Sequence, residues 1–373
     1  VLDSPILSNS QFEKFFEFFK KNCKILDCTF NVEENLKSRL DRLCSEAEIA
    51  VREGYKDLIL SDKKVNEKKI PVPMIMAIGA INSRLVKLGI RGFASINVQT
   101  AEAFDTHSCA VLIGVGATTI NPYVAFDSIY QRYEKNLFGK LSFEECIHRY
   151  IDSLDNGLLK IMSKMGISVL SAYRGGCNFE AVGISRAVIA DYFPGMVSRI
   201  SGIGINGIEK KIKALHKKAY QKNVSILPIG GIYKYRKNGE LHQYQGELIH
   251  LLQYAVSINS YDNYKKYTQG IYDLPPINLR DLLDFKKLKK PINIEEVELV
   301  SDLRKRFGSG SMSHGALSAE AHETLAIGMN RIGAASCSGE GGEDAKRYIK
   351  MKNGDSSNSR IKQIASARFG VTI

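Results

Sequence analysis

The sequence lacks the short motifs that would assign a chemistry directly. It contains no HExxH, no GxSxG, no P-loop lysine motif and no GxGxxG followed by a suitably placed acid. It also lacks a run of apolar residues long enough to span a bilayer, so we expect no membrane association. The function must therefore be sought in longer patterns.

The cysteines do not follow a metal-binding or disulfide spacing. There are seven, an odd number, and no two form a CxxC pair. This usage argues against a disulfide framework and a closed zinc site, and it is typical of a reducing compartment. We expect a cytoplasmic location, with a plastid as the alternative, and no metal ligands in this stretch.

Charge is present in excess, with a net value of +12 over 373 residues. Such a balance raises the question of a nucleic-acid partner. The lysines, however, are scattered along predicted helices and loops and form neither a tail nor an aromatic-interleaved patch. A solvated, lysine-rich surface explains them better, so we expect no nucleic acid. The first residue is Val1, which suggests a processed N-terminus or a piece of a longer chain.

One local pattern recurs: an amphipathic helix, a glycine that ends it, and a short β-branched run. The predicted helix-ending glycines are Gly54, Gly89, Gly116 and Gly166. A glycine just past a helix end readily adopts the left-handed conformation required there. Short strands alternating with helices predict an α/β fold with a parallel sheet, in either a barrel or an open form.

The second half is less regular until the pattern resumes near residue 308. We predict a turn at Asn238-Gly239 followed by a helix, and a connector over 273–300 containing a short helix at 279–287. The tail is then predicted to alternate three strands with one helix, in the segments 308–313, 318–333, 334–337 and 360–366. Ser318 should cap the helix, and Ala321, Leu325, Met329 and Ile332 should form its buried stripe. Two or three parallel strands cannot close a barrel, so the tail is interpreted as a truncated one.

Small residues follow each predicted strand of the tail, in "SMSHGALS" (311–318), "SCSGEGGED" (336–344) and "QIAS" (363–366). In a barrel of this type, functional groups lie in the loops after the strands. The glycines would let a planar cofactor rest against backbone, whereas the acids of 336–344 would repel a phosphate. Tight turns without a ligand remain the alternative.

The segment "SGSMSHGALSAEAHETLAIGMNRIGAASCSGEGGED" closely resembles the start of the FMN-binding synthase barrel of the glutamate synthase large subunit. "SRIKQIASARFGV" (359–371) is similar to the family's next segment. Upstream, "LDSPILSNSQFEKF", "GAINSRLVKLGIRG", "LIGVGATTINPY" and 157–184 resemble its central domain, in order. The resemblance implies a central domain at 1–272, a connector at 273–300, and at 301–373 the first strands of a (β/α)8 TIM-type barrel.

The resemblance implies an oxidoreductase acting on CH-NH2 donors. The family makes glutamate from 2-oxoglutarate and glutamine-derived ammonia, which a glutaminase domain of the same polypeptide releases into an internal tunnel. Reduced FMN then delivers a hydride to 2-iminoglutarate, after electrons have passed through a 3Fe-4S cluster whose ligands are expected outside this chain. The electrons come from an NAD(P)H-oxidising subunit or fused domain, or from ferredoxin. This stretch alone is expected to be inactive.

Motif by motif, the resemblance implies residues that line FMN and the 2-oxoglutarate side of the site. They are Met312, Ser313, Gly315, Ala316, Ser338, Gly339, Glu340, Gly341, Gly342 and Gln363. No catalytic proton donor is assigned. The chain departs from the family at Cys337-Ser338 and at Ala367, which leaves the details of the loops open. His314 could face the site or the solvent, and His322 is interpreted as structural.

Two other interpretations stay open. The chain could be a non-catalytic structural module that carries an incomplete barrel, or it could belong to another FMN-dependent barrel oxidoreductase. The amino-acid pattern of the strand-end loops is compatible with all three.

Overall fold

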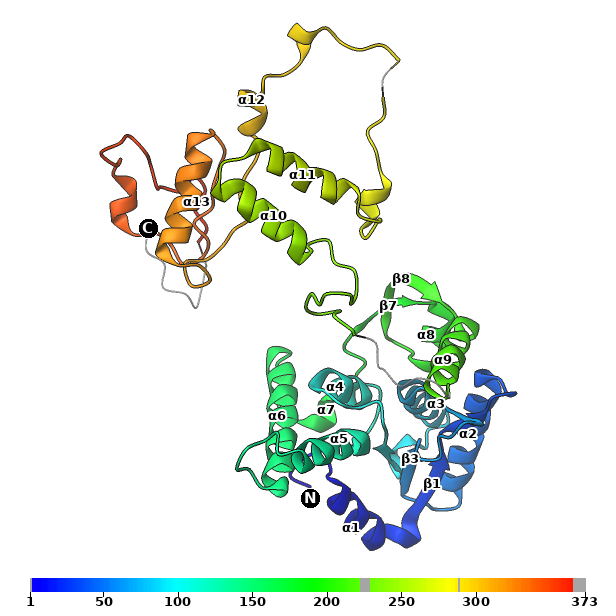
Figure 1. Cartoon of the computed structure of the whole chain (residues 1–373). Coiled ribbons are helices and arrows are strands. Elements are labelled where there is room, and N and C mark those ends of the chain that lie inside the picture. Colours follow the sequence, from blue (N-terminus) through cyan, green and yellow to red (C-terminus); the bar gives the residue numbers. More distant parts are fainter. Residues whose placement is uncertain (1, 222–228, 288, 365–373) are drawn as a thin grey trace. The chain divides into compact units, whose positions relative to one another are not determined.

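The computed structural model describes residues 2–221, 229–287 and 289–364 (Figure 1). The chain divides into two compact units, Val1–Leu227 and Pro228–Ile373, which are described separately. Within the described ranges, no helix is both long enough and apolar enough to cross a bilayer.

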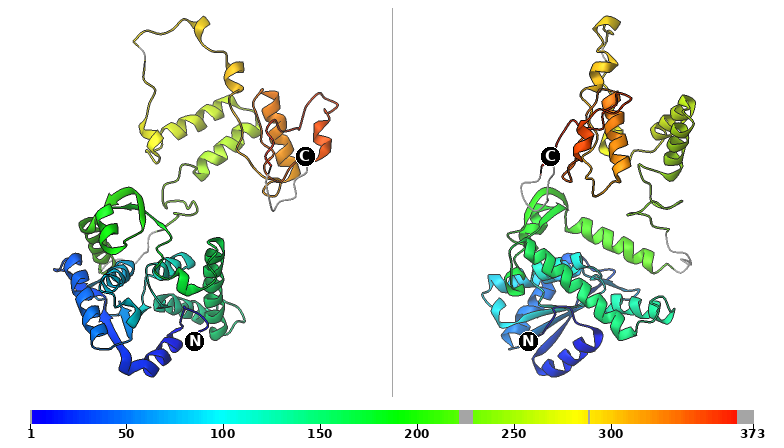
Figure 2. Two further views of the ribbon diagram at one scale, coloured as in Figure 1. Left: turned by 180° about the vertical axis from the view of Figure 1, so that it is seen from behind. Right: turned by 90° about the vertical axis from the view of Figure 1, so that its left-hand side faces the viewer.

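The first unit is built on a four-stranded parallel sheet in the order β1-β3-β5-β6. Figure 2 shows the chain from two further sides. The strands are β1 (Cys23–Asp27), β3 (Asp57–Ser61), β5 (Ser95–Gln99) and β6 (Thr119–Asn121), and the connecting helices are α2 (Leu36–Arg52), α3 (Met74–Lys87) and α4 (Thr106–Gly114). Gly54, Gly89 and Gly116 follow these helices with φ of 92°, 71° and 128°. The predicted α/β alternation and parallel sheet are therefore confirmed.

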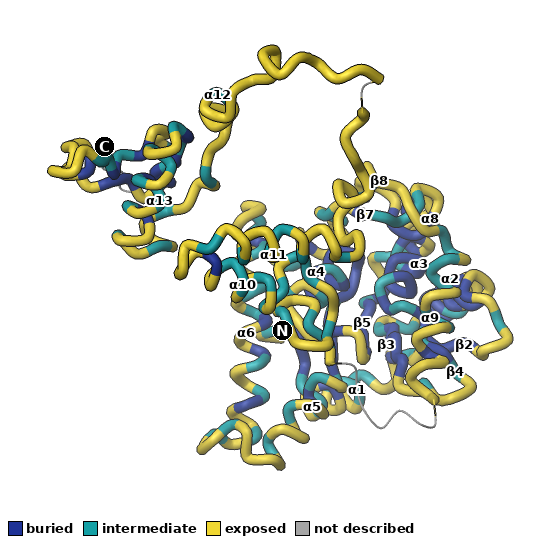
Figure 3. The backbone as a smooth tube through the Cα atoms, turned by 45° about the horizontal axis from the view of Figure 1, so that its top comes forward, coloured by how far each residue is buried: buried dark blue, intermediate teal, exposed yellow. Residues whose placement is uncertain are grey.

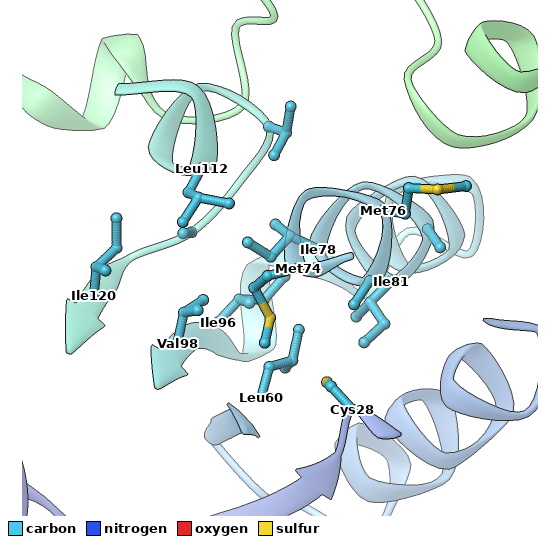
Figure 4. Packing of buried hydrophobic residues seen from close by; sticks show 14 of the residues in the cluster. Cys28, Leu60, Met74, Met76, Ile78, Ile81, Ile96, Val98, Leu112 and Ile120 are labelled. Carbon is cyan, nitrogen blue, oxygen red and sulfur yellow. The ribbon is translucent and has the colours of Figure 1, made fainter. Parts of the chain in front are cut away.

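One face of this sheet packs against the helices and forms the core. Leu60, Val98 and Ile120 of the strands meet Ile78 of α3 and Leu112 of α4 (Figure 4). All five side chains are at most 4% exposed. Burying a side chain of this size contributes about 1.5–3 kcal/mol, so this layer holds the sheet to its helices.

The opposite face of the sheet carries two rows of polar side chains. Thr119 donates to Asn97 (2.8 Å), and the amide of Asn97 donates to Asp57 (3.2 Å), so one row of side chains crosses three strands. In a second row, Ser61 donates to Gln99 (3.0 Å) and Gln99 donates to Asn121 (3.2 Å). These buried polar groups are tolerated because they satisfy one another. Helix α1 (Asn9–Phe19) packs on the same face through Phe12, beside Ile59.

The rest of the first unit surrounds this sheet with helices and two small pairs of strands. They are β2 (Thr29–Asn31), β4 (Lys69–Pro71), α5 (Tyr123–Glu134), α6 (Phe143–Lys164), α7 (Leu170–Tyr173), β7 (Glu180–Ile184), α8 (Arg186–Tyr192), β8 (Val197–Ile203) and α9 (Ile205–Ala219). Gly166 adopts the predicted left-handed conformation, with φ of 70°. The strand expected after it is wrong, because the short helix α7 forms there. Its Tyr173 is buried against α4 and donates to the carbonyl of Ala110 (3.2 Å).

The second unit begins with a helical hairpin, α10 (Gly246–Ser257) and α11 (Tyr261–Tyr272), preceded by the predicted turn at Asn238, whose φ is 60°. The predicted domain boundary at 272 falls after this hairpin. The predicted helix at 279–287 is only a 3₁₀ turn, Leu279–Leu282, and a second turn, Ile294–Glu296, and α12 (Val300–Arg304) follow. Leu283 is extended, and both it and Phe285 are exposed, so no packing supports a longer helix.

The tail contains α13 (Ala319–Arg331), capped by Ser318 as predicted, and a 3₁₀ turn at Ala345–Tyr348. The predicted strands are reduced to two parallel bridges, Gly308↔Ala335 and Cys337↔Ile361. Their order and direction are those of three consecutive strands at the start of a TIM-type barrel. Residues 365 and 366 of the last predicted strand lie outside the described residues.

The buried face of α13 differs from the predicted stripe. His322 and Ala326 are buried, Leu325 and Met329 are half-buried, and Ala321 and Ile332 are exposed. The buried stripe is thus shifted by one residue from the predicted one, and it includes a histidine that hydrogen-bonds the carbonyls of Met312 and Ser338.

Candidate functional site

The loops after the first two strand segments of the tail lie in contact. Gly339 has φ of 68°, and a Cβ at this position would come within 2.7 Å of the Met312 carbonyl oxygen. A Cβ on Gly341 would come within 2.9 Å of Ser313 Oγ. The loop of residues 338–342 can therefore approach residues 312–314 only because positions 339 and 341 lack a side chain.

Gln363, after the third strand segment, joins this group. Its Oε1 accepts a hydrogen bond from Ser311 Oγ, and its Nε2 donates to Glu340 Oε1 (3.3 Å). Cys337 Sγ lies 3.4 Å from Ser311 Oγ and 3.9 Å from Gln363 Oε1. The three strand ends thus share a cluster of small, mostly uncharged polar groups.

Ser338 is the buried link between the second and third strand ends. It is 2% exposed, its N–H donates to the Ile361 carbonyl (3.0 Å), and its Oγ accepts from the Gln363 N–H (3.1 Å). This residue departs from the family pattern, and its hydroxyl forms the hydrogen bond that holds Gln363. Ala367, the other departure, lies outside the described residues.

Not every predicted site residue reaches this cluster. Gly315 and Ala316 form an exposed turn in which the N–H of Ala316 donates to the Ser313 carbonyl (2.8 Å). Met312 is 37% exposed, and Gly342 is buried with φ of 73°. His314 is exposed, with its ring centroid 5.9 Å from that of His322. The turn therefore borders the cluster, and the described hydrogen bonds of Gln363 go to Ser311, Ser338 and Glu340 instead.

A buried charged network underlies the loops, and sequence reasoning missed most of it. Arg347 is 2% exposed, and its Nη2 lies 3.1 Å from Glu343 Oε1 and 2.6 Å from the Ser357 carbonyl. Lys362 Nζ binds the other oxygen of Glu343. Glu343 and Arg347 are four residues apart, but Glu343 lies outside any α-helix, so the helical spacing rule did not indicate this pair. No local pattern indicated Lys362.

Glu343 remains ionised within this network. Burial raises the pKa of its carboxyl group, but the hydrogen bonds from Lys362 and Ser359 and the charge of Arg347 outweigh burial and hold the pKa below its usual range. The acids of the loop therefore have different roles: Glu343 fixes the loop from below, and Glu340 faces Gln363.

The exposed groups at the strand ends fit a planar, uncharged ring better than a phosphate. Gln363, Ser311 and the glycine backbone are neutral, and the acid nearest to them is Glu340, which would repel an anion. The Gln363 amide carries two N–H groups and uses one of them on Glu340, so among the described residues the second N–H has no acceptor. Among the residues that the structure describes, no three His, Cys, Asp or Glu side chains are grouped as a metal site would require.

Two family models match the chain. The model of the glutamate synthase central domain matches residues 1–185, and that of a conserved region in glutamate synthase matches residues 242–373. Each of the two units therefore carries a match.

Curated relatives align with the whole length or nearly so. The chain is 50% identical over 374 positions to the glutamate synthase [NADPH] large chain of Azospirillum brasilense, covering 100% of the chain and 25% of the relative. It is 43% identical over 371 positions to that of Bacillus subtilis, covering 99% and 24%. It is 38% identical over 405 positions to the chloroplastic ferredoxin-dependent glutamate synthase of Oryza sativa, covering 100% and 25%.

The chain thus spans about a quarter of the length of these relatives. Both models carry the same family in their descriptions, and the matches run in order along the two units. The chain therefore belongs to the glutamate synthase large-subunit family.

Proposed function

We propose that this chain is the part of a glutamate synthase that joins the central domain to the FMN-binding barrel and supplies one side of the flavin site. The full protein would make L-glutamate from 2-oxoglutarate and ammonia released from glutamine. The observation that carries this proposal is the meeting of three strand ends at Gln363, Ser338 and the glycine loop.

Each group has a physical task in this proposal. The backbone at Gly339, Gly341 and Gly342 would admit a flat ring, and the second amide N–H of Gln363 would donate to the ring's polar edge. Ser311 and Glu340 hold the Gln363 amide in one orientation. Met312, Ser313 and the turn at Gly315-Ala316 border the 2-oxoglutarate side. When bound, FMN would supply the hydride that reduces 2-iminoglutarate.

The remaining parts come from outside this chain. The 3Fe-4S cluster, the glutaminase domain and the later barrel strands belong to other regions of the polypeptide in this proposal. We propose NADPH as the electron source, through a partner subunit or fused domain, and a cytoplasmic location. Alignments with the two NADPH-dependent relatives take 374 and 371 positions, whereas the ferredoxin-dependent relative needs 405 and so carries additional residues within this region.

The test uses the full-length protein supplied with glutamine, 2-oxoglutarate and either NADPH with its oxidising partner or reduced ferredoxin. With NADPH, we expect two glutamate molecules to form for each NADPH oxidised. The variant Gln363→Ala should lower kcat/KM about tenfold or more, because the amide that would donate to the flavin ring is removed. Gln269→Ala, on exposed α11, is the matched control. A full-length protein that forms no glutamate with either donor would favour the structural-module interpretation.

A further inference from the structure

His322 is buried beneath the two loops and uses both of its ring nitrogens. The residue is 3% exposed. Its Nε2 lies 3.1 Å from the carbonyl oxygen of Met312 and 3.1 Å from that of Ser338. Its Nδ1 lies 2.6 Å from Nη1 of Arg347. One imidazole therefore contacts both strand-end loops and the buried guanidinium.

The hydrogen-bond partners determine where the imidazole proton lies. A guanidinium can only donate, so Nδ1 of His322 must accept and carries no proton. The two backbone carbonyls can only accept, so the proton is on Nε2 and is shared between them. Arg347 thereby selects the tautomer that can bind Met312 and Ser338 together.

The guanidinium of Arg347 is held in one orientation. Its Nε and Nη2 donate to the Ser357 carbonyl at 2.8 and 2.6 Å, and Nη2 also meets Glu343. These contacts fix the plane of the guanidinium and leave Nη1 directed at the imidazole. The tautomer of His322 is thus set by a rigid group at a fixed position.

We propose that His322 is a positioning residue that holds the first two strand-end loops at the separation the flavin ring requires. This role rests on the proposed function. We call the hydrogen bonds from His322 to Met312 and Ser338 the clamp. It extends to the third strand end, because the Oγ of Ser338 also accepts the N–H of Gln363. A single Nε2–H group therefore sets the relative positions of Met312, Ser338 and Gln363.

The test replaces His322 in the full-length protein in two ways. His322→Phe keeps a ring but removes the donor and the acceptor, leaving two carbonyls and one guanidinium N–H unpaired. His322→Gln keeps one amide donor for the carbonyls and one oxygen for Arg347. The matched control is His216→Phe, a buried histidine of the first unit whose Nε2 bonds a single carbonyl, that of Asn66 (2.9 Å).

Two readouts are independent of turnover: amide hydrogen exchange of residues 312–317 and 338–342 without FMN, and the FMN dissociation constant. His322→Phe should speed exchange in both loops and weaken FMN binding, each by about tenfold, because buried acceptors lose their donor. His322→Gln should restore most of the loop protection and of the FMN affinity. In His322→Phe, kcat should fall more than the KM for 2-oxoglutarate changes. His216→Phe should leave both loops and the FMN constant unchanged.

Loop exchange and FMN affinity within twofold of wild type in His322→Phe would overturn the proposal. So would a His322→Gln protein as impaired as His322→Phe. If His322→Phe does not fold, His322→Asn takes its place in the same comparison, because its shorter amide can replace Nδ1 toward Arg347 but not the Nε2 donor to the two carbonyls. A wild-type protein that binds FMN but forms no glutamate would contradict the proposed function and leave the clamp supported by its exchange pattern.

Discussion

At the scale of single residues, Gly339 is constrained in two separate ways. Its φ of 68° disfavours any side chain, and the Met312 carbonyl occupies the space that a Cβ would take. Gly354 has φ of 87°, but a Cβ added there would meet no atom within 4 Å, so it is constrained only by its backbone. Comparing substitutions at Gly339 and Gly354 therefore separates the cost of backbone strain from the cost of steric contact.

We expect Gly339→Ala to destabilise the second unit by about 2 kcal/mol more than Gly354→Ala, because overpacking adds to strain. Chemical unfolding of each variant in the full-length protein measures the difference. Equal losses for the two variants would contradict the contact between Gly339 and Met312.

The pKa of Glu343 predicts an acid-dependent loss of stability. Its folded-state pKa lies below that of an unfolded glutamate, about 4.3. The stabilisation is therefore complete above that value and disappears as pH falls through the lower, folded-state pKa. Glu343→Gln should cost about 3 kcal/mol near pH 7, because Arg347 is left without its carboxylate, and should flatten the acid limb.

Unfolding free energies between pH 3 and 7 test this, with the exposed Asp344→Asn as the control. An acid limb of the same slope in Glu343→Gln and wild type would refute the role of Glu343.

Several site residues could be named from the sequence, but only through the resemblance. Composition and spacing indicated flexible, small strand-end loops, and the family motif singled out Gln363 and the glycines. The partners Arg347, Lys362 and Ser311 could not be predicted because each is brought to the site by tertiary contacts from a different segment.

At the scale of elements, the prediction that a strand follows each helix-ending glycine was correct where the next segment joined the sheet. Gly54, Gly89 and Gly116 each precede a strand. After Gly166 the same rule predicted a strand wrongly, since Tyr173 packs on α4 instead. Local pattern specifies where a helix ends, whereas tertiary packing decides which element forms next.

Helix interiors offer a direct test of packing against propensity. Gly79 of α3 faces Phe193, whose ring would lie 2.3 Å from an added Cβ, and the carbonyl of Tyr192 would lie at 2.8 Å. Gly328 of α13 has open space at the same point. We expect Gly79→Ala to destabilise by about 1–3 kcal/mol and Gly328→Ala to stabilise by up to about 1 kcal/mol.

Thermal unfolding of the two variants provides the measurement. A stabilised Gly79→Ala protein would mean that α3 and α8 are not packed as closely as the structure places them.

At the scale of the whole molecule, burial is distributed unevenly (Figure 3). The hydrophobic core clusters lie within the first unit. In the described part of the second unit, the fully buried hydrophobic residues are Ala255, Ala326 and Ala334. A unit with so little apolar burial gains little from folding alone.

We therefore expect a chain of residues 1–221 to unfold cooperatively on heating, and a chain of residues 229–373 to lose its structure gradually. Circular dichroism over a temperature scan distinguishes the two behaviours. A sharp transition in the second piece would show that its ordered loops and charged network suffice for stability.

The polar face of the sheet has a consequence for how faithfully the first unit folds. A slip of one residue in the pairing of β3 and β5 would turn Asp57, Asn97 and their neighbours toward the apolar helices. It would also break the side-chain rows that cross the strands. A misaligned sheet would thus bury polar groups against apolar helices and also lose side-chain hydrogen bonds. The alternation of polar and apolar residues therefore selects the native strand register.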